Sequence, residues 1–398
     1  MKVIINDIKD EGIKRLEEYA RFQPPSYEYY RQAIQDVLAK IDGNLEVFKN
    51  KVPASASNNL VYEAIDNTYW TSSFWSGMLW LAYEITGDSK YCLIAEEQLK
   101  LHRKRLEERI KIDTHDLGFL YTLSAVASFK LTGNEGAKDL ALTAAKHLSG
   151  RYWEGAGIIQ AWGEMDNPEE QGRMIIDCLL NLPLLYWASE VTGNVRYREM
   201  AYNHACQNAR YIVRKDASTF HTFFLDVDTG QPVGGKTHQG FADDSCWARG
   251  QSWGIYGFPL SYRYTGDWKL IEVAKRLSNY FLNRLPEDHV PYWDLIFDGG
   301  VERDSSAAAI TSCGLLELSR HLPLADSSKR IYENAALTIL SSLTDGYTTK
   351  DVPHSNGVLL HGLQHKPKGL GVDECCIWGD YYYFEALVRV VKDWKPYW

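Results

Sequence analysis

The chain has 398 residues, with 43 lysine and arginine side chains against 52 aspartate and glutamate side chains, and a formal net charge of −9. Because it is acidic and has no long basic run, we expect no nucleic-acid partner. No stretch has the length and hydrophobicity of a transmembrane helix, and the charged residues 1–15 lack the apolar core of a signal peptide, so we expect no membrane association. The seven cysteines are scattered without a CxxC pair, which favours free thiols in a cytoplasmic protein.

Apolar helical segments alternate along the chain with more polar ones. A polar helix is expected over residues 27–48, and apolar helices are expected over 74–85, 117–131, 179–191, 253–264, 305–318 and 380–391. A helix that is apolar on most sides is buried, whereas one with a charged face meets solvent, so we predict six inner and six outer helices. The simplest closed arrangement is a single all-α domain over residues 1–398, an (α/α)6 barrel.

Four of the apolar segments end at the same turn, Thr-Gly followed by Asp or Asn. These turns occupy residues 86–88, 132–134, 192–194 and 265–267. Glycine supplies the left-handed residue that ends one helix, and Asp or Asn caps the next. The residues that lie 15 or 16 positions before each turn are Trp70, Asp116, Asp177 and Arg249. At about 1.5 Å per residue, each lies roughly 24 Å from its turn, so we predict that all four crowd one mouth of the barrel.

Asp116 and Asp177 are the candidate catalytic pair. A single aspartate at a helix start is usually a cap, but two aspartates at one rim beside His115 and Arg249 favour a catalytic role. A buried carboxyl group near another carboxylate keeps its proton to higher pH and can act as a general acid. Because proline is tolerated only in the first turn of a helix, Pro183 leaves open a helix that starts after Asp177 and places this residue on the preceding loop.

The segment 234–253 is dense in glycine, polar groups and tryptophan, and it runs into the fourth apolar helix. Within it, His238, Arg249 and Trp253 offer a donor, a permanent cation and a stacking face, which favours a binding site over a plain loop. His221 lies in an alternating stretch typical of a short strand. The 13 tryptophans and 25 tyrosines also suit a sugar ligand, whose C–H faces stack on aromatic rings.

The sequence gives little support to a metal or a nucleotide cofactor. His354, His361 and His365 could suggest zinc, but no paired cysteines accompany them and the segment is broken by glycine, proline and lysine. No GxGxxG or Walker-type loop is present. We therefore expect neither a metal nor a cofactor, and the sequence leaves a monomer or a homodimer open.

Together, these residues resemble the unsaturated glucuronyl hydrolases of glycoside hydrolase family 88. The matching segments span most of the chain and are specific only as a set: 67–71, 115–119, 177–183, 238–253 and 378–382. The resemblance implies an (α/α)6 barrel that needs no metal. It also implies a substrate made by polysaccharide lyases, a glycosaminoglycan oligosaccharide with a 4,5-unsaturated uronic acid at its non-reducing end.

Carried over from the family, Asp177 would be the general acid and base, and Asp116 the second essential carboxylate that sets its charge state. The unsaturated-sugar subsite would be lined by Trp70, His115, Trp162, His221, His238, Gln239, Arg249 and Trp253. Hydration of the C4=C5 bond needs a protonated acid in the resting enzyme, which predicts a mildly acidic optimum.

The chain departs from the family at one loop. Members that favour sulfated chondroitin carry Ser-x-x-Ser-x-Lys before the last inner helix, where this chain has His365, Lys368 and Leu370. The replacement argues against a strong sulfate preference and admits unsulfated chondroitin or hyaluronan disaccharides, although Lys366 and Lys368 could still meet a sulfate as point charges. Three alternatives stay open: a rhamnogalacturonyl hydrolase that acts on pectin fragments, a sugar epimerase with paired histidine bases, and a sugar-binding barrel without catalysis.

Overall fold

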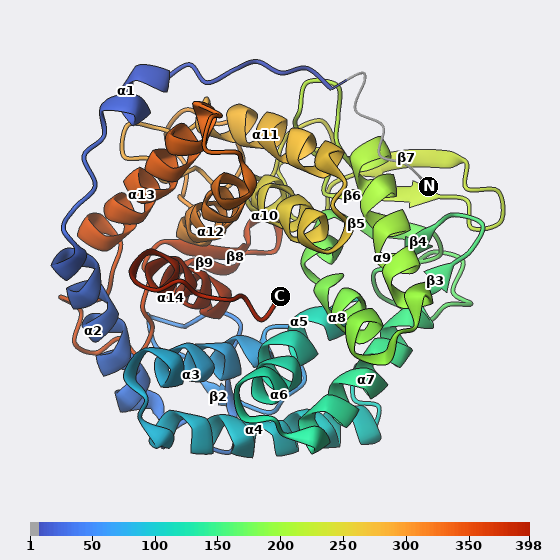
Figure 1. Ribbon diagram of the computed structural model, residues 1–398, viewed down its shortest axis with the longest axis horizontal. Helices are drawn as coiled ribbons and strands as arrows, with labels where there is room; N and C mark the ends of the chain where they lie inside the picture. Colours follow the sequence, from blue (N-terminus) through green and yellow to red (C-terminus); the bar gives the residue numbers. More distant parts are fainter. Residues whose placement is uncertain (1–7) are drawn as a thin grey trace.

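The computed structural model describes residues 8–398, whose helices form a closed ring of six hairpins, an (α/α)6 barrel (Figure 1). The inner ring consists of α3 (Ser72–Thr86), α5 (Leu117–Tyr121) with η1 (Thr122–Val126) and α6 (Ala127–Thr132), α8 (Pro183–Thr192), α10 (Ala248–Thr265), α12 (Ser305–His321) and α14 (Ile377–Val391). The outer ring consists of α2 (Tyr27–Asn44), α4 (Ser89–Glu107), α7 (Glu135–Ser149), α9 (Val195–Gln207), α11 (Trp268–Leu282) and α13 (Ser328–Gly346). The predicted six inner and six outer helices are confirmed. A short helix, α1 (Leu16–Arg21), precedes them.

The four Thr-Gly turns join inner to outer helices as predicted. Their glycines have φ between 69° and 73°, a left-handed conformation that side chains with a Cβ rarely adopt. The Asp or Asn that follows each glycine accepts a hydrogen bond from a backbone N–H of the next helix. Local sequence alone therefore fixes one rim of the barrel.

The third inner helix starts later than the hydrophobic pattern predicts. Pro183 occupies the first position of α8, where its missing N–H costs nothing. Before it, η2 (Ile176–Leu180) is a 3-10 helix, and it carries Asp177. The fourth inner helix starts earlier than predicted, at Ala248, so Arg249 lies inside its first turn.

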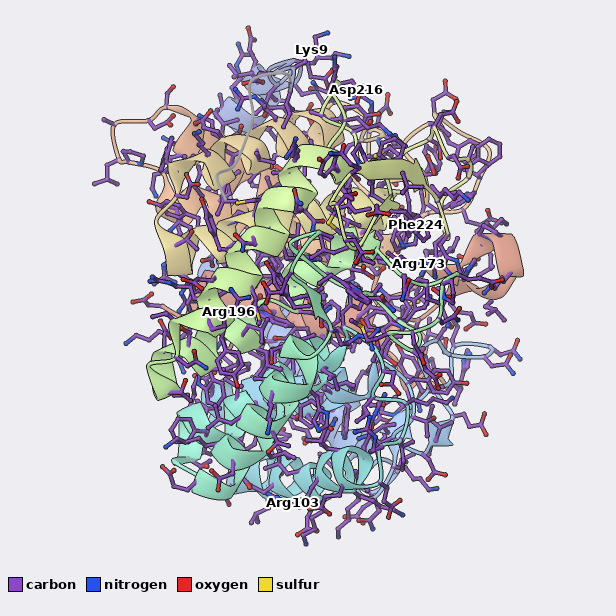
Figure 2. All side chains as sticks on the ribbon, turned by 90° about the vertical axis from the view of Figure 1, so that its right-hand side faces the viewer. Lys9, Arg103, Arg173, Arg196, Asp216 and Phe224 are labelled. Atoms are coloured by element: carbon purple, nitrogen blue, oxygen red, sulfur yellow. The ribbon has the colours of Figure 1, made fainter. Side chains whose placement is uncertain are left out.

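The molecule is not purely helical, because the long connections at the rim opposite the Thr-Gly turns carry short strands. They pair antiparallel as β1 (Val52–Pro53) with β2 (Ala64–Ile65), β3 (Tyr152–Trp153) with β4 (Ile158–Ile159), β5 (Arg173–Ile175) with β6 (Thr222–Leu225) and β7 (Pro232–Lys236), and β8 (Gly362–His365) with β9 (Leu370–Glu374). His221 directly precedes β6. In a side view, Arg173 and Phe224 mark the three-stranded sheet, while Arg103 projects outward from α4 (Figure 2).

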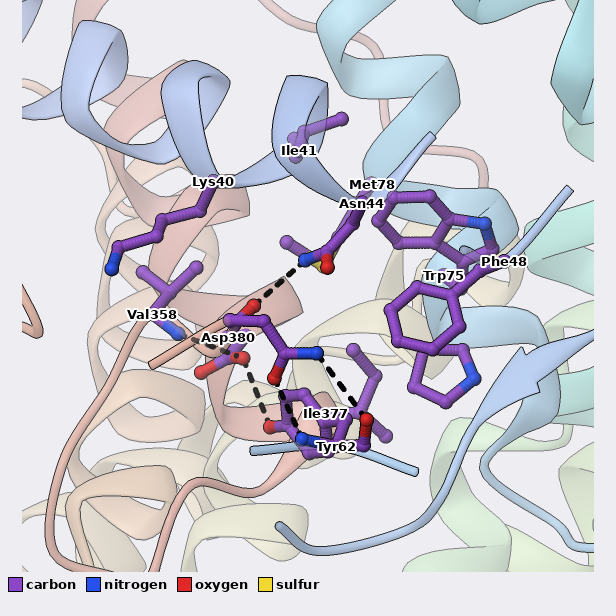
Figure 3. Close-up of a pocket in the computed structure, with 12 residues that line it drawn as sticks. Lys40, Ile41, Asn44, Phe48, Tyr62, Trp75, Met78, Val358, Ile377 and Asp380 are labelled. Atoms are coloured by element: carbon purple, nitrogen blue, oxygen red, sulfur yellow. Dashed lines mark hydrogen bonds between the residues drawn. The ribbon is translucent and has the colours of Figure 1, made fainter. Parts of the chain in front are cut away.

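Asp380, near the start of α14, ties two of these connections to the inner ring. Its carboxylate accepts hydrogen bonds from the Tyr62 hydroxyl at 2.9 Å and from the backbone N–H of Val358 at 3.1 Å (Figure 3). It also accepts one from the backbone N–H of Leu359 at 2.8 Å. Burial raises its pKa to about 7 despite these donors.

The described residues contain no helix long and apolar enough to cross a membrane, and all seven cysteines are free thiols.

A buried ion cluster lies on the inner faces of α12 and α14. Arg389 bonds to Glu317 at 2.8 Å and to Glu385 at 2.9 Å, and the three side chains are 6%, 1% and 0% exposed. Buried charges are tolerated only when they are paired, so this arginine compensates two carboxylates at once.

We predict that Arg389→Met lowers the free energy of unfolding by about 3–5 kcal/mol, because it leaves buried Glu385 without a cation and buried Glu317 with only the imidazole of His321. Urea denaturation at neutral pH measures this loss. The matched control is Arg21→Met, which breaks an ion pair with Glu17 whose side chains are 81% and 80% exposed and should cost less than about 1 kcal/mol. Equal losses in the two variants would contradict the assignment.

Candidate active site

A cavity of about 190 Å³ opens at the mouth of the barrel opposite the Thr-Gly turns. Nine residues predicted from the sequence line it: Trp70, His115, Asp116, Trp162, Asp177, His238, Gln239, Arg249 and Trp253. Four lining residues were not predicted as site residues: Trp247, Gln364, His365 and Trp378. The spacing argument from the turns is therefore confirmed for all four residues to which it was applied.

The two aspartates do not act as helix caps. Asp116 directly precedes α5, but its side chain caps no backbone N–H; its Oδ2 accepts a hydrogen bond from the Thr114 hydroxyl at 2.7 Å. Its Oδ1 lies 3.5 Å from Nε2 of His115. Asp177 lies in η2, and its buried Oδ1 has no hydrogen-bond partner in the described structure. A buried acceptor left without a donor is costly unless the group carries a proton or meets a ligand.

The environment drives the two carboxyl groups apart in pKa. Burial, together with the nearby charge of Asp116, raises the pKa of Asp177 to about 8. Burial also raises the pKa of Asp116, to about 6, although the Thr114 hydroxyl and the charges of Arg105 and Arg151 act in the opposite direction. At neutral pH the pair therefore holds one proton, on Asp177, beside one carboxylate, on Asp116. Two carboxyl groups separated in this way can act as a general acid and its electrostatic partner.

Asn181 holds the first turn of α5 against the η2 turn. Its Oδ1 accepts a hydrogen bond from the backbone N–H of Phe119 at 2.7 Å, and its Nδ2 donates to the carbonyl of Asp177 at 3.4 Å. Gly118 allows this contact, because a Cβ there would lie 2.2 Å from the Cα of Asn181. The first turn of α5 and the η2 turn thus pack backbone to backbone, which sets the separation of the two aspartates.

Aromatic rings form the walls of the cavity. Trp70 stacks on Trp378 with 5.3 Å between ring centroids and 30° between planes, and it also contacts Phe119 at 5.4 Å. Trp253 also packs on Phe119, with 5.5 Å between ring centroids. The Trp162 and His238 rings pack together with 5.3 Å between their centroids. Flat apolar faces beside polar tips are suited to a sugar ring.

Arg249 reaches the cavity, but its charge is not free, contrary to the cation expected from the sequence. Its guanidinium bonds to the buried carboxylate of Asp304 at 2.6 Å and donates to the side-chain carbonyl of Gln239 at 2.8 Å and to the carbonyl of Gln364 at 2.7 Å. Only 2% of the side chain is exposed. Arg249 therefore holds Gln239 and strand β8 in place around the cavity.

His221, Lys366 and Lys368 do not line the cavity. His221 lies behind it, where its Nδ1 accepts hydrogen bonds from the backbone N–H groups of His238 and Gln239, both at 3.0 Å. Lys366 is engaged by an ion pair with Glu302, and Lys368 is exposed in η4 (Lys366–Lys368), the turn between β8 and β9. These two lysines are thus neighbours of the cavity and not part of its wall.

The missed residues come from parts of the chain that the spacing argument did not reach. Trp378 lies one residue inside α14, as Arg249 lies one residue inside α10, but no Thr-Gly turn follows α14 to measure from. His365 was considered as a metal ligand and as a replacement in the family's sulfate loop, but not as a lining residue. It is buried against His238 at 5.1 Å, and neither ring nitrogen has a hydrogen-bond partner in residues 8–398. His361, by contrast, bonds to Asp373 at 2.6 Å.

Comparisons with known proteins place the whole chain among characterised hydrolases. The family model described as Glycosyl Hydrolase Family 88 matches residues 44–379. The unsaturated chondroitin disaccharide hydrolase of Streptococcus pneumoniae is 46% identical over 397 residues, which cover 99% of this chain and 100% of that protein. A crystal structure of unsaturated glucuronyl hydrolase from Streptococcus agalactiae has a TM-score of 0.97 at 46% identity, with 100% of both chains covered. A variant from the same organism, complexed with dGlcA-GalNAc6S, has a TM-score of 0.89 at 43% identity, again with 100% of both chains covered.

The raised pKa of Asp177 predicts how stability depends on pH. In the unfolded chain this group ionises near 3.8, whereas in the folded protein it ionises near 8. The folded state therefore carries a penalty that is absent below pH of about 4 and grows as pH rises towards 8. Asp177→Asn removes the penalty, so its gain in unfolding free energy over the unchanged protein should be roughly 3 kcal/mol larger at pH 7 than at pH 4.5.

Denaturant titrations of both proteins at the two pH values measure this gain, with Asp298→Asn at an exposed aspartate as the control. If the gain of Asp177→Asn is the same at both pH values, the Asp177 pKa is not raised by the fold.

Proposed function

This chain belongs to glycosyl hydrolase family 88, and from that premise we propose that it releases the 4,5-unsaturated uronic acid from the non-reducing end of glycosaminoglycan oligosaccharides. The substrates we propose are unsaturated chondroitin and hyaluronan disaccharides. The names of the relatives and the disaccharide bound to the Streptococcus agalactiae variant support this substrate class. The observation that carries the proposal is the buried carboxyl group of Asp177, without a hydrogen-bond partner at Oδ1 in the described structure, beside Asp116 in a cavity with tryptophan walls. Burial and Asp116 raise its pKa to about 8, which keeps the proton that the reaction needs.

The C4=C5 bond of the substrate is a vinyl ether, whose electron-rich carbon is C4. Asp177 donates its proton to C4, and positive charge develops on C5 and is shared with the ring oxygen. The carboxylate of Asp177 then takes a proton from the water that attacks C5, which restores the acid and forms a hemiketal. The hemiketal opens as the bond between C5 and the ring oxygen breaks, and the resulting hemiacetal at C1 releases the neighbouring sugar.

The other lining residues support this sequence of steps. Asp116 stays ionised, which favours the protonated form of Asp177 and stabilises positive charge on the sugar as it develops. Trp70 and Trp253 offer apolar faces to the ring, and His115, His238 and Gln239 offer polar atoms to its hydroxyl and carboxylate groups. Because bond breaking at C1 follows hydration at C5, the carboxylate separations of ordinary glycosidases do not apply to this pair.

An absorbance assay tests the proposal, since hydration of the C4=C5 bond removes its ultraviolet chromophore. The protein should bleach unsaturated chondroitin and hyaluronan disaccharides and leave an unsaturated rhamnogalacturonan disaccharide unchanged. Asp177→Asn should still bind the disaccharide by calorimetry but lose turnover by about 10²–10⁴-fold, because it has no proton to give. The control, Asp298→Asn, should keep its rate.

Loss of absorbance with the rhamnogalacturonan substrate alone would assign the chain to pectin degradation. No loss with any of the three substrates would reject catalysis of this kind, and a near-normal rate for Asp177→Asn would remove this residue from its role.

Lys368 provides a test of sulfate recognition. It is exposed at the tip of the β8–β9 hairpin. Burial is the main cause that lowers the pKa of His238 and of His365, and the charge of Lys368 lowers the pKa of both further. A sulfate on the sugar next to the unsaturated unit would meet this field. We therefore predict that Lys368→Ala raises KM roughly two- to five-fold for a 6-sulfated disaccharide and leaves KM for the unsulfated one unchanged.

Michaelis constants for the matched pair of substrates measure this effect, with Lys350→Ala at another exposed lysine as the control. An equal rise for both substrates would show that Lys368 acts on the fold of the hairpin and not on the sulfate.

A further inference from the structure

The end of the described chain lies inside the barrel. In Figure 1 the label of this end stands at the centre of the ring, within the inner helices. The segment 394–398, here called the tail, is held by residues next to the Thr-Gly turns. Glu84 accepts hydrogen bonds from the Trp394 indole at 2.7 Å and the Tyr397 hydroxyl at 2.6 Å, and the Tyr264 hydroxyl donates to the carbonyl of Trp398 at 2.9 Å. The tail therefore fills the end of the barrel opposite the catalytic cavity.

Trp398 extends deepest into the core. Its side chain is 0% exposed, and its indole N–H donates to Glu385 at 2.8 Å. Its ring stacks on Tyr382 at 6.0 Å with 13° between planes, and it meets the edge of Phe119 at 6.1 Å. Glu385 is in turn bonded to Arg389, so the indole is oriented by a fixed, buried charge.

Phe119 is shared between the tail and the catalytic cavity. On its other sides it contacts Trp70 and Trp253, which both line the cavity. Its backbone N–H is held by Asn181, which also holds the carbonyl of Asp177. A single aromatic layer thus separates Trp398 from the walls and the turn that position the acid.

Solvent reaches the outer side of the tail. A pocket of about 470 Å³ lies at the same end of the barrel, lined by the tail residues Lys395 and Tyr397 together with Lys130 and Arg263. Tyr264, which bonds to the carbonyl of Trp398, lines the same pocket. Removal of the Trp398 ring would open a path for water from this pocket towards Phe119.

We propose that Trp398 is a positioning residue for the reaction, which closes the floor of the catalytic cavity from the far end of the barrel and keeps Phe119 and the Asp177 turn dry. This inference rests on the proposed function for its consequence in catalysis. With the floor closed, the carboxyl group of Asp177 has no water behind it and holds its proton. With the floor open, water solvates the ionised form, so Asp177 loses its proton at lower pH and the enzyme loses its acid.

The charged groups around Asp177 are unaffected by a change at Trp398. The titratable groups that face it are His115 and Asp116 ahead of α5, Cys178 beside it in η2, and Arg249 on α10. The titratable groups that contact Trp398 are Glu385 and four tyrosines, Tyr256, Tyr264, Tyr381 and Tyr382, and Arg389 pairs with Glu385 behind them. A shift in the titration of Asp177 after substitution of Trp398 would therefore report a change of solvation and not the loss of a neighbouring charge.

The test compares Trp398→Ala with the conservative Trp398→Phe in the full chain. Carbon-13 NMR of the aspartate carboxyl groups measures the pKa of Asp177, whose signal is assigned as the one missing from Asp177→Asn. The pH dependence of kcat on an unsaturated disaccharide measures the alkaline limb of activity. In Trp398→Ala, both should fall by about one pH unit, within the range that burial produces. In Trp398→Phe, the Asp177 pKa and the alkaline limb should both stay close to those of the unchanged protein. Trp268→Ala, at a tryptophan that is 38% exposed on an outer helix, should change neither.

A purely structural role would lower the melting temperature of Trp398→Ala but leave the Asp177 titration and the alkaline limb unmoved, and this result would overturn the inference. If Trp398→Ala does not fold, Trp398→Leu is judged by the same two measurements. Absence of turnover by the unchanged protein on every unsaturated disaccharide would defeat the proposed function, but the NMR titration would still decide whether Trp398 keeps Asp177 dry.

Discussion

The structure depends on a carboxyl group that is denied water. Asp177 is buried beside Asp116, and two carboxylates in one dry site cannot both be ionised at little cost. One of them therefore keeps its proton near neutral pH, and that proton is the reagent that an electron-rich carbon requires. The fold accepts a stability penalty at Asp177, and this penalty is what makes the group an acid.

The barrel creates this situation by bringing two helix starts together at one mouth. Gly118 lets the first turn of α5 contact the η2 turn, and Asn181 bonds to both. Around this junction, aromatic rings exclude solvent on the wall side, and Trp398 fills the space beneath Phe119. Arg249 supports the cavity by a different means. Paired with Asp304, it holds Gln239 and β8 without placing an uncompensated cation in the site.

Much of this arrangement could be predicted from the sequence, because it follows from local rules. Repeated Thr-Gly turns mark one end of each inner helix, and helical rise then places Trp70, Asp116, Asp177 and Arg249 at the other end. Pro183 left open a helix that starts after Asp177, and the structure begins α8 at Pro183 with Asp177 in the 3-10 helix before it. The chemistry of the reaction entered through the family resemblance, since spacing alone cannot specify a substrate.

The rest depends on contacts between distant parts of the chain, which no local pattern records. The pairing of Arg249 with Asp304 turns an expected substrate cation into a support. The packing of His365 on His238 makes it a wall of the cavity, a role that its place in a loop broken by glycine, proline and lysine did not indicate. His221 likewise lies behind the cavity because its ring accepts the backbone N–H groups of two lining residues. The alternating stretch at His221 did indicate β6, but the other strands were missed because they are short pieces within long connections. The tail was missed because a few residues that follow the last helix show no periodicity.

Infrared difference spectroscopy of the unchanged protein against Asp177→Asn, recorded near pH 6.5, tests the central claim most directly. We predict a carbonyl stretch of a protonated carboxylic acid that is present in the unchanged protein, absent from the variant and lost as the pH is raised past about 8. A difference spectrum that shows only the bands of an ionised carboxylate at pH 6.5 would contradict the account.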